Sequence, residues 1–196
     1  MTSANSFFPS YAALNGQASP YVPNDAGRLV LSATSGLTLG GRLTGDPGPG
    51  GLGGQVDISS QYLQVVGNGE TVDPGYLGIS ADALDELGAA SLLIGGTRKM
   101  TDAGTVITPT ANGVIVSNDA AHPLTGQEIL LVAAPQFQSS TIVLDSEADT
   151  TTVQVPIADT GLVSIRNGSV IQATGSGSDV GGETLVMGNT LPSCSA

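Results

Sequence analysis

The stretch Leu37–Ser59 reads LTLGGRLTGDPGPGGLGGQVDIS. Apolar residues alternate with polar or small residues at its start and again at its end, and a bend rich in glycine and proline separates the two runs. Alternation with a period of two is typical of a half-buried strand, whereas Gly and Pro favour turns. A related pattern returns at 162–187 as LVSIRNGSVIQATGSGSDVGGETLVM. Both segments therefore predict short strands joined by glycine-rich corners.

The spacing between comparable positions indicates a repeat. Nearly equal intervals separate Leu37 from Val56, Leu43 from Leu63, and Val56 from Leu77. A steady period of roughly 20 residues, built from very short strands, is the signature of a parallel β-solenoid, in which each turn of the chain stacks on the next. The sequence therefore predicts an all-β fold with about 20 residues per rung.

Composition favours the same architecture. In the opening stretch the alternation places Leu37, Leu39 and Leu43 inward, and Thr38 and Arg42 outward. Stacked rungs bring equivalent outward side chains together, so like charges would repel, whereas Gly, Ser and Thr are tolerated. Charged residues make up 11% of the chain, against about 25% in ordinary soluble domains. Aromatic residues are only 4% and Trp is absent, so the core must be built from Val, Ile, Leu and Ala.

One segment departs from the strand pattern. Residues 80–88 (SADALDELG) predict a short helix, because Ser80 or Asp82 can cap its start and Gly88 can end it. We expect residues 80–104 to form an excursion from the solenoid wall. Strands are expected at 29–31, 37–39, 56–58, 62–66, 91–94, 105–108, 114–117, 128–133, 141–144, 152–156, 162–165, 169–172 and 184–187.

A single domain is predicted, since no change of composition divides the chain. Residues 1–26, with three prolines, read as an irregular lead-in that could cover one end of the solenoid. Residues 27–190 form the predicted parallel β-helix, and 191–196 form a tail that contains the lone Cys194. One cysteine cannot form an internal disulfide, so it does not report the redox compartment.

Charge excludes two classes of partner. The net charge is −12 with only five Lys and Arg, so the chain lacks the clustered cations that bind nucleic acid or an anionic membrane surface. The first part of the chain contains no basic segment followed by an apolar one, so no targeting signal is predicted. No window of about 18 residues is apolar enough for membrane insertion.

Three motifs resemble chemical sites but favour structural explanations. His122 is the only histidine, so it has no second His or Cys with which to hold a metal, and we expect a solvated loop residue. Residues 48–53 match GxGxxG, but a strand rather than a helix follows, so we interpret the match as accidental. Residues 175–179 (GSGSD) are similar to calcium-binding repeats but lack their iteration.

Carboxylates gather after the strand expected at 141–144. Asp145, Glu147 and Asp149 could serve as the paired acids of a glycosidase or lyase, but a solvated turn is the preferred interpretation. Asn167-Gly168-Ser169 matches a glycosylation sequon. We therefore assign no catalytic, cofactor-binding or metal-binding residue and expect no cofactor.

The chain resembles the filamentous haemagglutinin family, the large exoproteins of bacterial two-partner secretion. The resemblance lies in the repeat pattern of Leu37–Ser59 and 168–185, and in the block 83–98 (ALDELGAASLLIGGTR), and covers about residues 27–190. It implies a right-handed parallel β-helix that a partner pore exports across the outer membrane. The Asn-Pro-rich motifs of the family's secretion domain are absent from this sequence, so the resemblance implies an internal or distal shaft segment without catalytic residues.

The expected function is accordingly structural. We expect a non-enzymatic segment of a secreted or surface-displayed adhesin that gives a rigid stalk for attachment. Its partners would be a host-cell or matrix surface, or neighbouring shaft segments of the same protein. The alternative is a carbohydrate-active β-helix, a polysaccharide lyase or a phage tailspike-like depolymerase that uses Asp145 or Asp149. A third possibility is a receptor-binding module whose contact site is the excursion at 80–104.

Overall fold

The computed structural model describes residues 4–18, 24–48, 51–143, 150–174 and 183–188. Within these ranges the chain is mostly strand, and its two helices are short. The predicted all-β fold class is therefore confirmed. None of the helices in the described ranges is long and apolar enough to span a membrane.

The largest sheet has five strands in the order β1-β2-β5-β10-β15, and every neighbouring pair is parallel. Val56, for example, lies opposite Leu29 on one side and opposite Leu92 on the other. Each strand thus pairs with a strand from an earlier or later passage of the chain. The members of this sheet, called sheet A below, are β1 (Arg28–Ser32), β2 (Gln55–Ser59), β5 (Ser91–Ile94), β10 (Glu128–Ala133) and β15 (Glu183–Gly188).

A second parallel sheet, called sheet B, has the order β13-β8-β3-β4. A third pair, β14-β9, is parallel as well. The strands of these sheets are β3 (Tyr62–Val66), β4 (Leu77–Ser80), β8 (Gly113–Ser117) and β13 (Leu162–Ile165), followed by β9 (Leu124–Gly126) and β14 (Ile171–Ala173).

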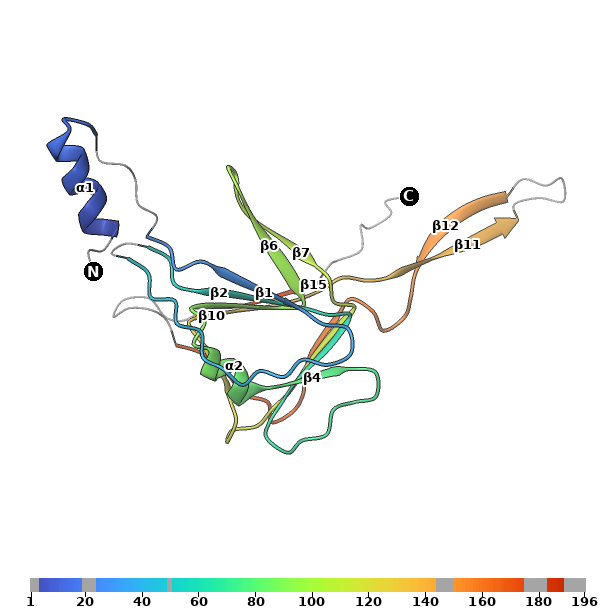
Figure 1. Ribbon diagram of the computed structural model, residues 1–196. Helices are drawn as coiled ribbons and strands as arrows, with labels where there is room; N and C mark the ends of the chain where they lie inside the picture. Colours follow the sequence, from blue (N-terminus) through green and yellow to red (C-terminus); the bar gives the residue numbers. More distant parts are fainter. Residues whose placement is uncertain (1–3, 19–23, 49–50, 144–149, 175–182, 189–196) are drawn as a thin grey trace.

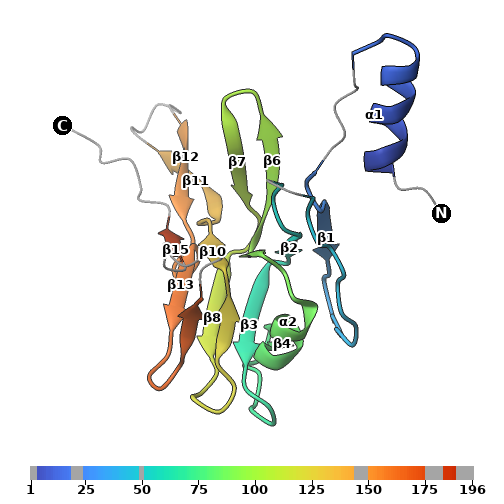
Figure 2. The same cartoon turned by 90° about the vertical axis from the view of Figure 1, so that its left-hand side faces the viewer.

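Three sides surround one apolar core. Figure 1 looks along the direction in which the strands stack, with β1 in front and β15 behind, and Figure 2 shows the strands of each sheet side by side. Helix α2 (Ala81–Leu87) contacts β9 and so extends the third side. Alternate side chains of the strands point inward, as the period of two predicts, and the largest buried ones are Ile58, Leu63, Ile94, Leu124, Ile129 and Leu131, with Val56, Val65, Val114 and Val116.

Two antiparallel hairpins project from the same corner, the one between sheet A and sheet B (Figure 1). In the passage that contains β2 and β3 this corner is only Ser60 and Gln61, which join the two strands. In the next it holds β6 (Gly96–Thr101) and β7 (Gly104–Pro109), and in the one after that β11 (Phe137–Val143) and β12 (Thr150–Pro156). The corners stack, because Asn112 N–H donates to the Gln61 carbonyl at 2.7 Å and Gly161 N–H donates to the Asn112 carbonyl. The hairpins are therefore insertions at one fixed place.

The predicted period of about 20 residues is wrong as a pairing register. Val56 pairs with Leu29 of the preceding passage and with Leu92 of the following one, and these two intervals are unequal and both longer than predicted. Leu63 and Leu77 do lie side by side, but at an interval shorter than predicted. Hairpins, helix α2 and the loop at 67–76 add different lengths of chain to each passage. Positions with similar Leu-Gly patterns, such as Leu37 and Val56, are therefore not the positions that pair.

The opening stretch is only partly a strand. Residues 37–48 have no regular secondary structure, so the strand expected at 37–39 is wrong, whereas β2 at Gln55–Ser59 is confirmed. The predicted alternation nevertheless holds. Leu37, Leu39 and Leu43 are half-buried against the core, while Thr38 and Arg42 are exposed. Irregular backbone can thus bury the same face as a strand.

Residues 80–104 behave differently from the expected excursion. The short helix is confirmed: Ser80 caps the start of α2, and Gly88 ends it at φ 68°. However, β5 lies between β2 and β10 at the centre of sheet A, so this part belongs to the wall. The reason is that Ser91–Ile94 are apolar or small in a row, which suits a strand that is buried on both faces. Only α2 and the β6–β7 hairpin depart from the wall.

The lead-in is not irregular throughout. Helix α1 spans Ala4–Leu14 and contains Pro9. The prolines favour irregular structure, yet Ala12, Ala13 and Leu14 are strong helix formers in the last turn. The tail at 191–196 lies outside the described residues.

Candidate functional site

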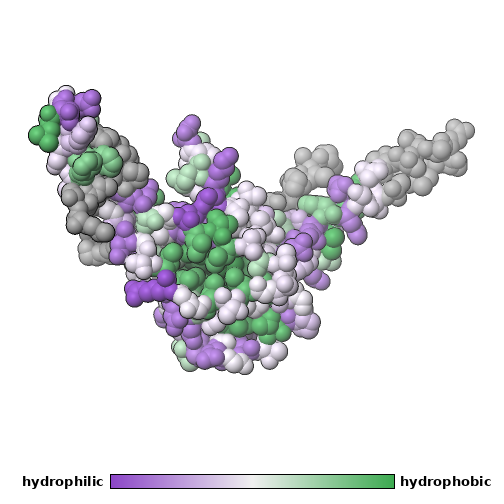
Figure 3. All heavy atoms as spheres, viewed as in Figure 1, coloured by the Kyte–Doolittle hydropathy of each residue, from purple (hydrophilic) through white to green (hydrophobic). Residues whose placement is uncertain are grey.

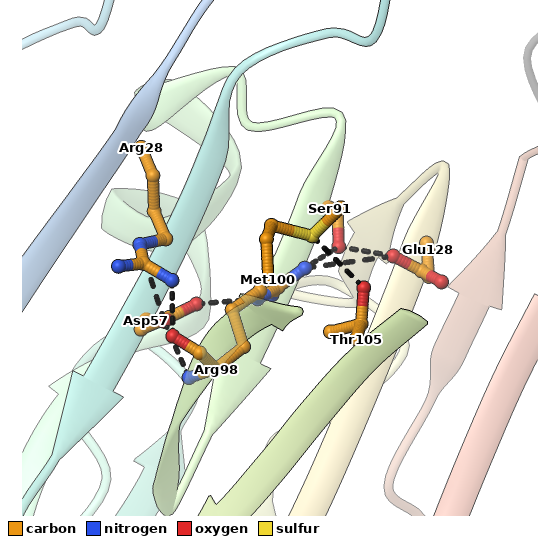
Figure 4. A network of polar contacts seen from close by, with 7 residues as sticks. All are labelled: Arg28, Asp57, Ser91, Arg98, Met100, Thr105 and Glu128. Carbon is orange, nitrogen blue, oxygen red and sulfur yellow. Dashed lines mark hydrogen bonds and ion pairs between the residues drawn. The ribbon is translucent and has the colours of Figure 1, made fainter. Parts of the chain in front are cut away.

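A buried ion pair lies on the outer face of sheet A (Figure 4). Asp57 is the middle residue of β2 and points away from the core, yet it is 0% exposed because hairpin β6–β7 folds over it. Arg98 of β6 donates its backbone N–H to Asp57 Oδ2 at 2.9 Å and its Nε–H to Oδ1 at 2.6 Å. Arg98 is itself only 4% exposed, so both charges are removed from water.

Further polar contacts extend this pair along the sheet. Arg98 Nη1 donates to Ser91 Oγ at 2.6 Å, and Ser91 Oγ in turn donates to Glu128 Oε2. Ser91 and Glu128 occupy the same register position on β5 and β10, so the network follows the stacking direction. Arg28 of β1 donates to the Arg98 carbonyl. Residues of four strands, β1, β2, β5 and β10, thereby contact the side chain or the backbone of Arg98.

A small apolar cluster completes the seat of the hairpin. Leu93, Leu130 and Val132 face outward from sheet A and pack with Ile107 of β7. The network and this cluster fix the base of the hairpin, while its tip remains exposed, with the side chain of Met100 more than half exposed. Both oxygens of the Asp57 carboxylate accept a hydrogen bond from Arg98 and the side chain is closed to solvent, so a substrate cannot reach it. Its role is structural.

A hollow of about 420 Å³ opens beside the hairpin. Its lining includes Arg28 and Lys99, two of the five basic residues of the chain, together with Asp25, Leu52 and Met100. Asp25 is engaged, since it accepts a hydrogen bond from Leu52 N–H at 2.8 Å. In Figure 4, Met100 lies on the hairpin beside Thr105, whose hydroxyl donates to its sulfur at 3.0 Å.

Helix α2 uses its acids to hold the third side. Asp85 accepts hydrogen bonds from Thr125 N–H at 2.8 Å and from the Thr125 hydroxyl at 2.5 Å. Thr125 lies on β9, whose other edge pairs with β14, so the carboxylate takes the place of a neighbouring strand's carbonyl. Burial raises the pKa of Asp85 above its ordinary value, and the hydrogen bonds from Thr125 only partly offset that effect.

His122 is fixed to the same helix. Its Nδ1 lies 2.7 Å from Asp82 Oδ2, and its side chain is 26% exposed. The predicted loop position is confirmed, but the prediction of a solvated side chain is wrong, because the residue has a carboxylate partner and is half-buried. Within the described residues no hydroxyl or thiol hydrogen-bonds to the other ring nitrogen, so the pair lacks the nucleophile that a catalytic triad needs. The same part of the chain holds no group of three or more His, Cys, Asp or Glu side chains that could bind a metal.

A third polar cluster lies outside sheet B. The loop at 67–76 crosses the outer face of β3, where Asp73 N–H donates to the Gln64 side chain at 2.7 Å. Arg166, just after β13, donates to both carboxylate oxygens of Asp73. These hydrogen bonds lower the pKa of Asp73 and raise that of Arg166. The loop ends at Tyr76, whose ring meets that of Tyr62 edge to face with centroids 5.4 Å apart.

The other predicted motifs have structural surroundings or lie outside the described ranges. Of the stretch 48–53, residues 48 and 51–53 are described: Gly48 N–H donates to the Asn24 carbonyl at 2.6 Å, Ala26 N–H donates to the Leu52 carbonyl at 2.9 Å, and strand β2 follows, as predicted. In the sequon, Asn167 is exposed in the turn after β13. Asp145, Glu147 and Asp149, the GSGSD segment at 175–179, and Cys194 all lie outside the described residues.

Sequence reasoning misses the Asp57–Arg98 pair. The only signal in the sequence is a carboxylate at the centre of an apolar strand, which alternation assigns to solvent. The two residues are far apart in the chain and meet only because the hairpin folds back. Comparison with known proteins adds nothing to this assignment: neither a family model, nor a curated protein, nor a solved structure matches the chain.

Proposed function

We propose that the chain is a right-handed parallel β-helix that serves as a non-enzymatic segment of a secreted or surface-displayed adhesin-like exoprotein. The handedness follows from a general rule, since about 98% of crossovers between parallel strands of one sheet are right-handed. The β-helix architecture is supported by the parallel pairing of the strands in both large sheets. In sheet A, for example, β2, β5 and β10 are successive returns of the chain to one face. A stack of this kind needs neither a metal nor a disulfide for rigidity.

One observation carries the functional part of the proposal: two successive passages insert hairpins at the same corner. The exposed parts of β6 and β7 extend beyond the sheets on a base that is fixed by the buried Asp57–Arg98 pair. Rigid scaffolds commonly display their binding residues on such loops. We therefore assign attachment to the hairpin corner rather than to the flat walls.

Neighbouring shaft segments of the same protein are the second proposed partner. Figure 3 shows hydrophobic residues gathered in the middle of the end face that is in front in Figure 1. Leucines of the first passage, including Leu29, Leu31 and Leu37, are only partly buried against the core there. Export of a longer parent protein through an outer-membrane pore is a proposal that rests on the family resemblance alone.

Attachment can be measured with beads that carry the protein, applied under flow to cultured epithelial cells or to extracellular matrix. In the test variant, residues 100–105 are replaced by Asn-Gly, which closes the hairpin at the Lys99–Val106 pair with a tight turn and keeps Arg98. The variant loses one acidic residue, Asp102, so Glu70→Gln on the exposed loop at 67–76 is the charge-matched control.

We expect fewer retained beads for the hairpin variant and unchanged retention for Glu70→Gln, with equal circular dichroism spectra. Retention no better than that of an unrelated acidic protein would contradict the attachment function. Release of sugar products from a panel of acidic and neutral polysaccharides would contradict the non-enzymatic part and favour a lyase or depolymerase.

A further inference from the structure

From the pocket beside Tyr62 and Tyr76, we infer that the first corner of the molecule binds a neutral pyranose sugar. The pocket measures about 260 Å³ and lies at the corner between sheet A and sheet B, where residues 34–35 follow β1 and residues 60–61 join β2 to β3. Its polar lining consists of Thr34, Ser35, Ser60, Gln61, Tyr62 and Tyr76. Later passages fill the equivalent corner with hairpins, whereas here the corner is short and leaves the space open.

The size of the pocket limits the ligand. Pockets for drug-sized ligands measure about 300–1,000 Å³, so this one accommodates a single small ring. Its lining consists of hydroxyl and amide groups around two aromatic rings, a combination that can hydrogen-bond the edge hydroxyls of a sugar and cover its C–H face.

Charge limits the ligand further. None of the lining side chains carries a charge at neutral pH, because the only titratable ones are tyrosines. The chain as a whole has a net charge of −12, which disfavours anionic sugars. A neutral pyranose, alone or at the end of a glycan, fits both conditions.

The aromatic platform is held in place before any ligand arrives. Tyr76 N–H donates to the Asp73 carbonyl at 3.1 Å, and Asp73 is fixed by Gln64 and Arg166. The Tyr76 hydroxyl lies over Gly113, where an added Cβ would come within 2.8 Å of it. Gly113 therefore leaves the room that the tyrosine needs, and a platform fixed in this way loses little entropy on binding.

The test is a ¹H–¹⁵N correlation titration of the whole chain with methyl α-D-glucopyranoside, methyl β-D-galactopyranoside, maltotriose and sodium glucuronate. We expect saturable shifts with at least one neutral sugar, centred on residues 34–35, 60–62 and 75–77. Maltotriose separates a free monosaccharide from a glycan end: equal affinity for monosaccharide and trisaccharide favours a site for one terminal ring, and tighter trisaccharide binding favours a glycan chain. Either result supports the inference.

Variants then place the site. Tyr76→Ala should weaken binding about 2- to 13-fold, which is the fold-change that corresponds to the contribution of one aromatic contact beyond burial. Gly113→Ala places a Cβ 2.8 Å from the Tyr76 hydroxyl and 3.3 Å from the Tyr62 ring, so it shifts the two rings themselves and provides a second disruption if Tyr76→Ala is poorly folded. Tyr76→Phe should retain most of the affinity, and Tyr11→Ala on α1 is the control, because Tyr11 is an exposed tyrosine far from the pocket residues in the sequence.

Four results would overturn the inference: no saturable shift with any neutral sugar, shifts centred elsewhere, glucuronate binding at least as tight as that of the neutral sugars, or unchanged binding in both Tyr76→Ala and Gly113→Ala. The inference is independent of the proposed attachment function. Sugar binding without retention of beads on cells would leave the pocket assigned and contradict the adhesin role.

Discussion

At the scale of single residues, polar side chains in this molecule take the place of backbone or fix an inserted segment. Asp85 accepts the hydrogen bonds of a strand edge, and Asp57 anchors a hairpin through Arg98. Asn118 does similar work at another corner, where its side chain accepts from Val170 N–H at 3.1 Å and donates to the Val170 carbonyl at 2.7 Å. Such residues stabilise the stack where regular pairing ends.

The buried ion pair gives the largest expected effect of one substitution. Asp57→Leu should lower the free energy of unfolding by about 3–5 kcal/mol, because it leaves the buried Arg98 guanidinium with only the more distant Glu128 carboxylate, at 3.8 Å, as a countercharge. Asp57→Leu combined with Arg98→Met should recover most of the loss, since both charges are then absent. Urea unfolding followed by circular dichroism measures both. A double variant that is no more stable than the single one would show that the unpaired charge of Arg98 is not the cause of the lost stability.

Asp85 predicts an unusual dependence of stability on pH. Its pKa is raised in the folded state, so its contribution to stability is complete below the pKa of the unfolded chain and is lost as the pH rises through the folded value. Asp85→Asn should remove this loss while its side-chain oxygen still accepts from Thr125 N–H. The variant should therefore gain stability relative to the wild type between pH 4 and pH 7.

Asp73 provides the matched control for that measurement, because Arg166 lowers its pKa. The contribution of Asp73 to folding stability is present above the pKa of the unfolded chain and is lost as the pH falls through the lower folded pKa. Asp73→Asn should therefore remove this decrease in stability at acid pH. Urea midpoints at pH 3, 4, 5 and 7 separate the two. Parallel curves for the wild type and both variants would refute the assigned shifts.

At the scale of elements, the β6–β7 hairpin depends on one glycine. Gly95 follows β5 at φ 97°, and its carbonyl accepts from both Thr110 N–H and Ala111 N–H at 2.8 Å, so the chain leaves and returns at this residue. An added Cβ would lie 2.0 Å from the Val132 carbonyl oxygen. Side chains are unfavourable at such a φ by roughly 1–2 kcal/mol even without a clash.

Gly95→Ala should therefore destabilise the protein by more than about 2 kcal/mol. Gly104→Ala is the control: it has φ 121° but no atom near its Cβ, so it carries the conformational cost without the clash. Thermal unfolding compares the two. An equal cost for both variants would mean that the Val132 contact does not constrain the branch point.

Many of the strands and one of the helices can be predicted from the sequence. Alternation and short apolar runs predict the strands at Leu29–Leu31, Val56–Ile58 and 128–133, and capping residues predict helix α2. The order in which the strands pair cannot be predicted, because it depends on how many residues the hairpins and loops add to each passage. Helix α1 is missed because prolines outweigh local helix propensity in the interpretation of the sequence.

The candidate sites are harder to predict from the sequence. Tyr62 and Tyr76 meet only because β4 lies beside β3, and Asp57 meets Arg98 only because the hairpin folds over sheet A. Neither pairing leaves a motif at fixed spacing. By contrast, the accidental nature of the GxGxxG match is predictable, since the local order of strand and glycines decides it.

At the scale of the whole molecule, parallel strands from successive passages of the chain lie side by side around one core. Their register assigns Val56 to Leu92 and Leu92 to Ile129 in sheet A, and Leu63 to Val114 and Val114 to Val163 in sheet B. The corner that carries the hairpins and the pocket proposed for a sugar both depend on this stacking. The stacking is therefore the claim to test first.

The most direct measurement is an isotope-edited NOESY experiment on the uniformly labelled chain in solution. We expect the cross-strand amide and Hα contacts of parallel pairs at Val56–Leu92, Leu92–Ile129 and Leu63–Val114, and, among the residues that the structure describes, antiparallel Hα–Hα contacts only within the two hairpins. Antiparallel contacts between β2 and β5, or contacts between Leu37 and Val56 at the spacing of the sequence repeat in place of these, would contradict the stacking.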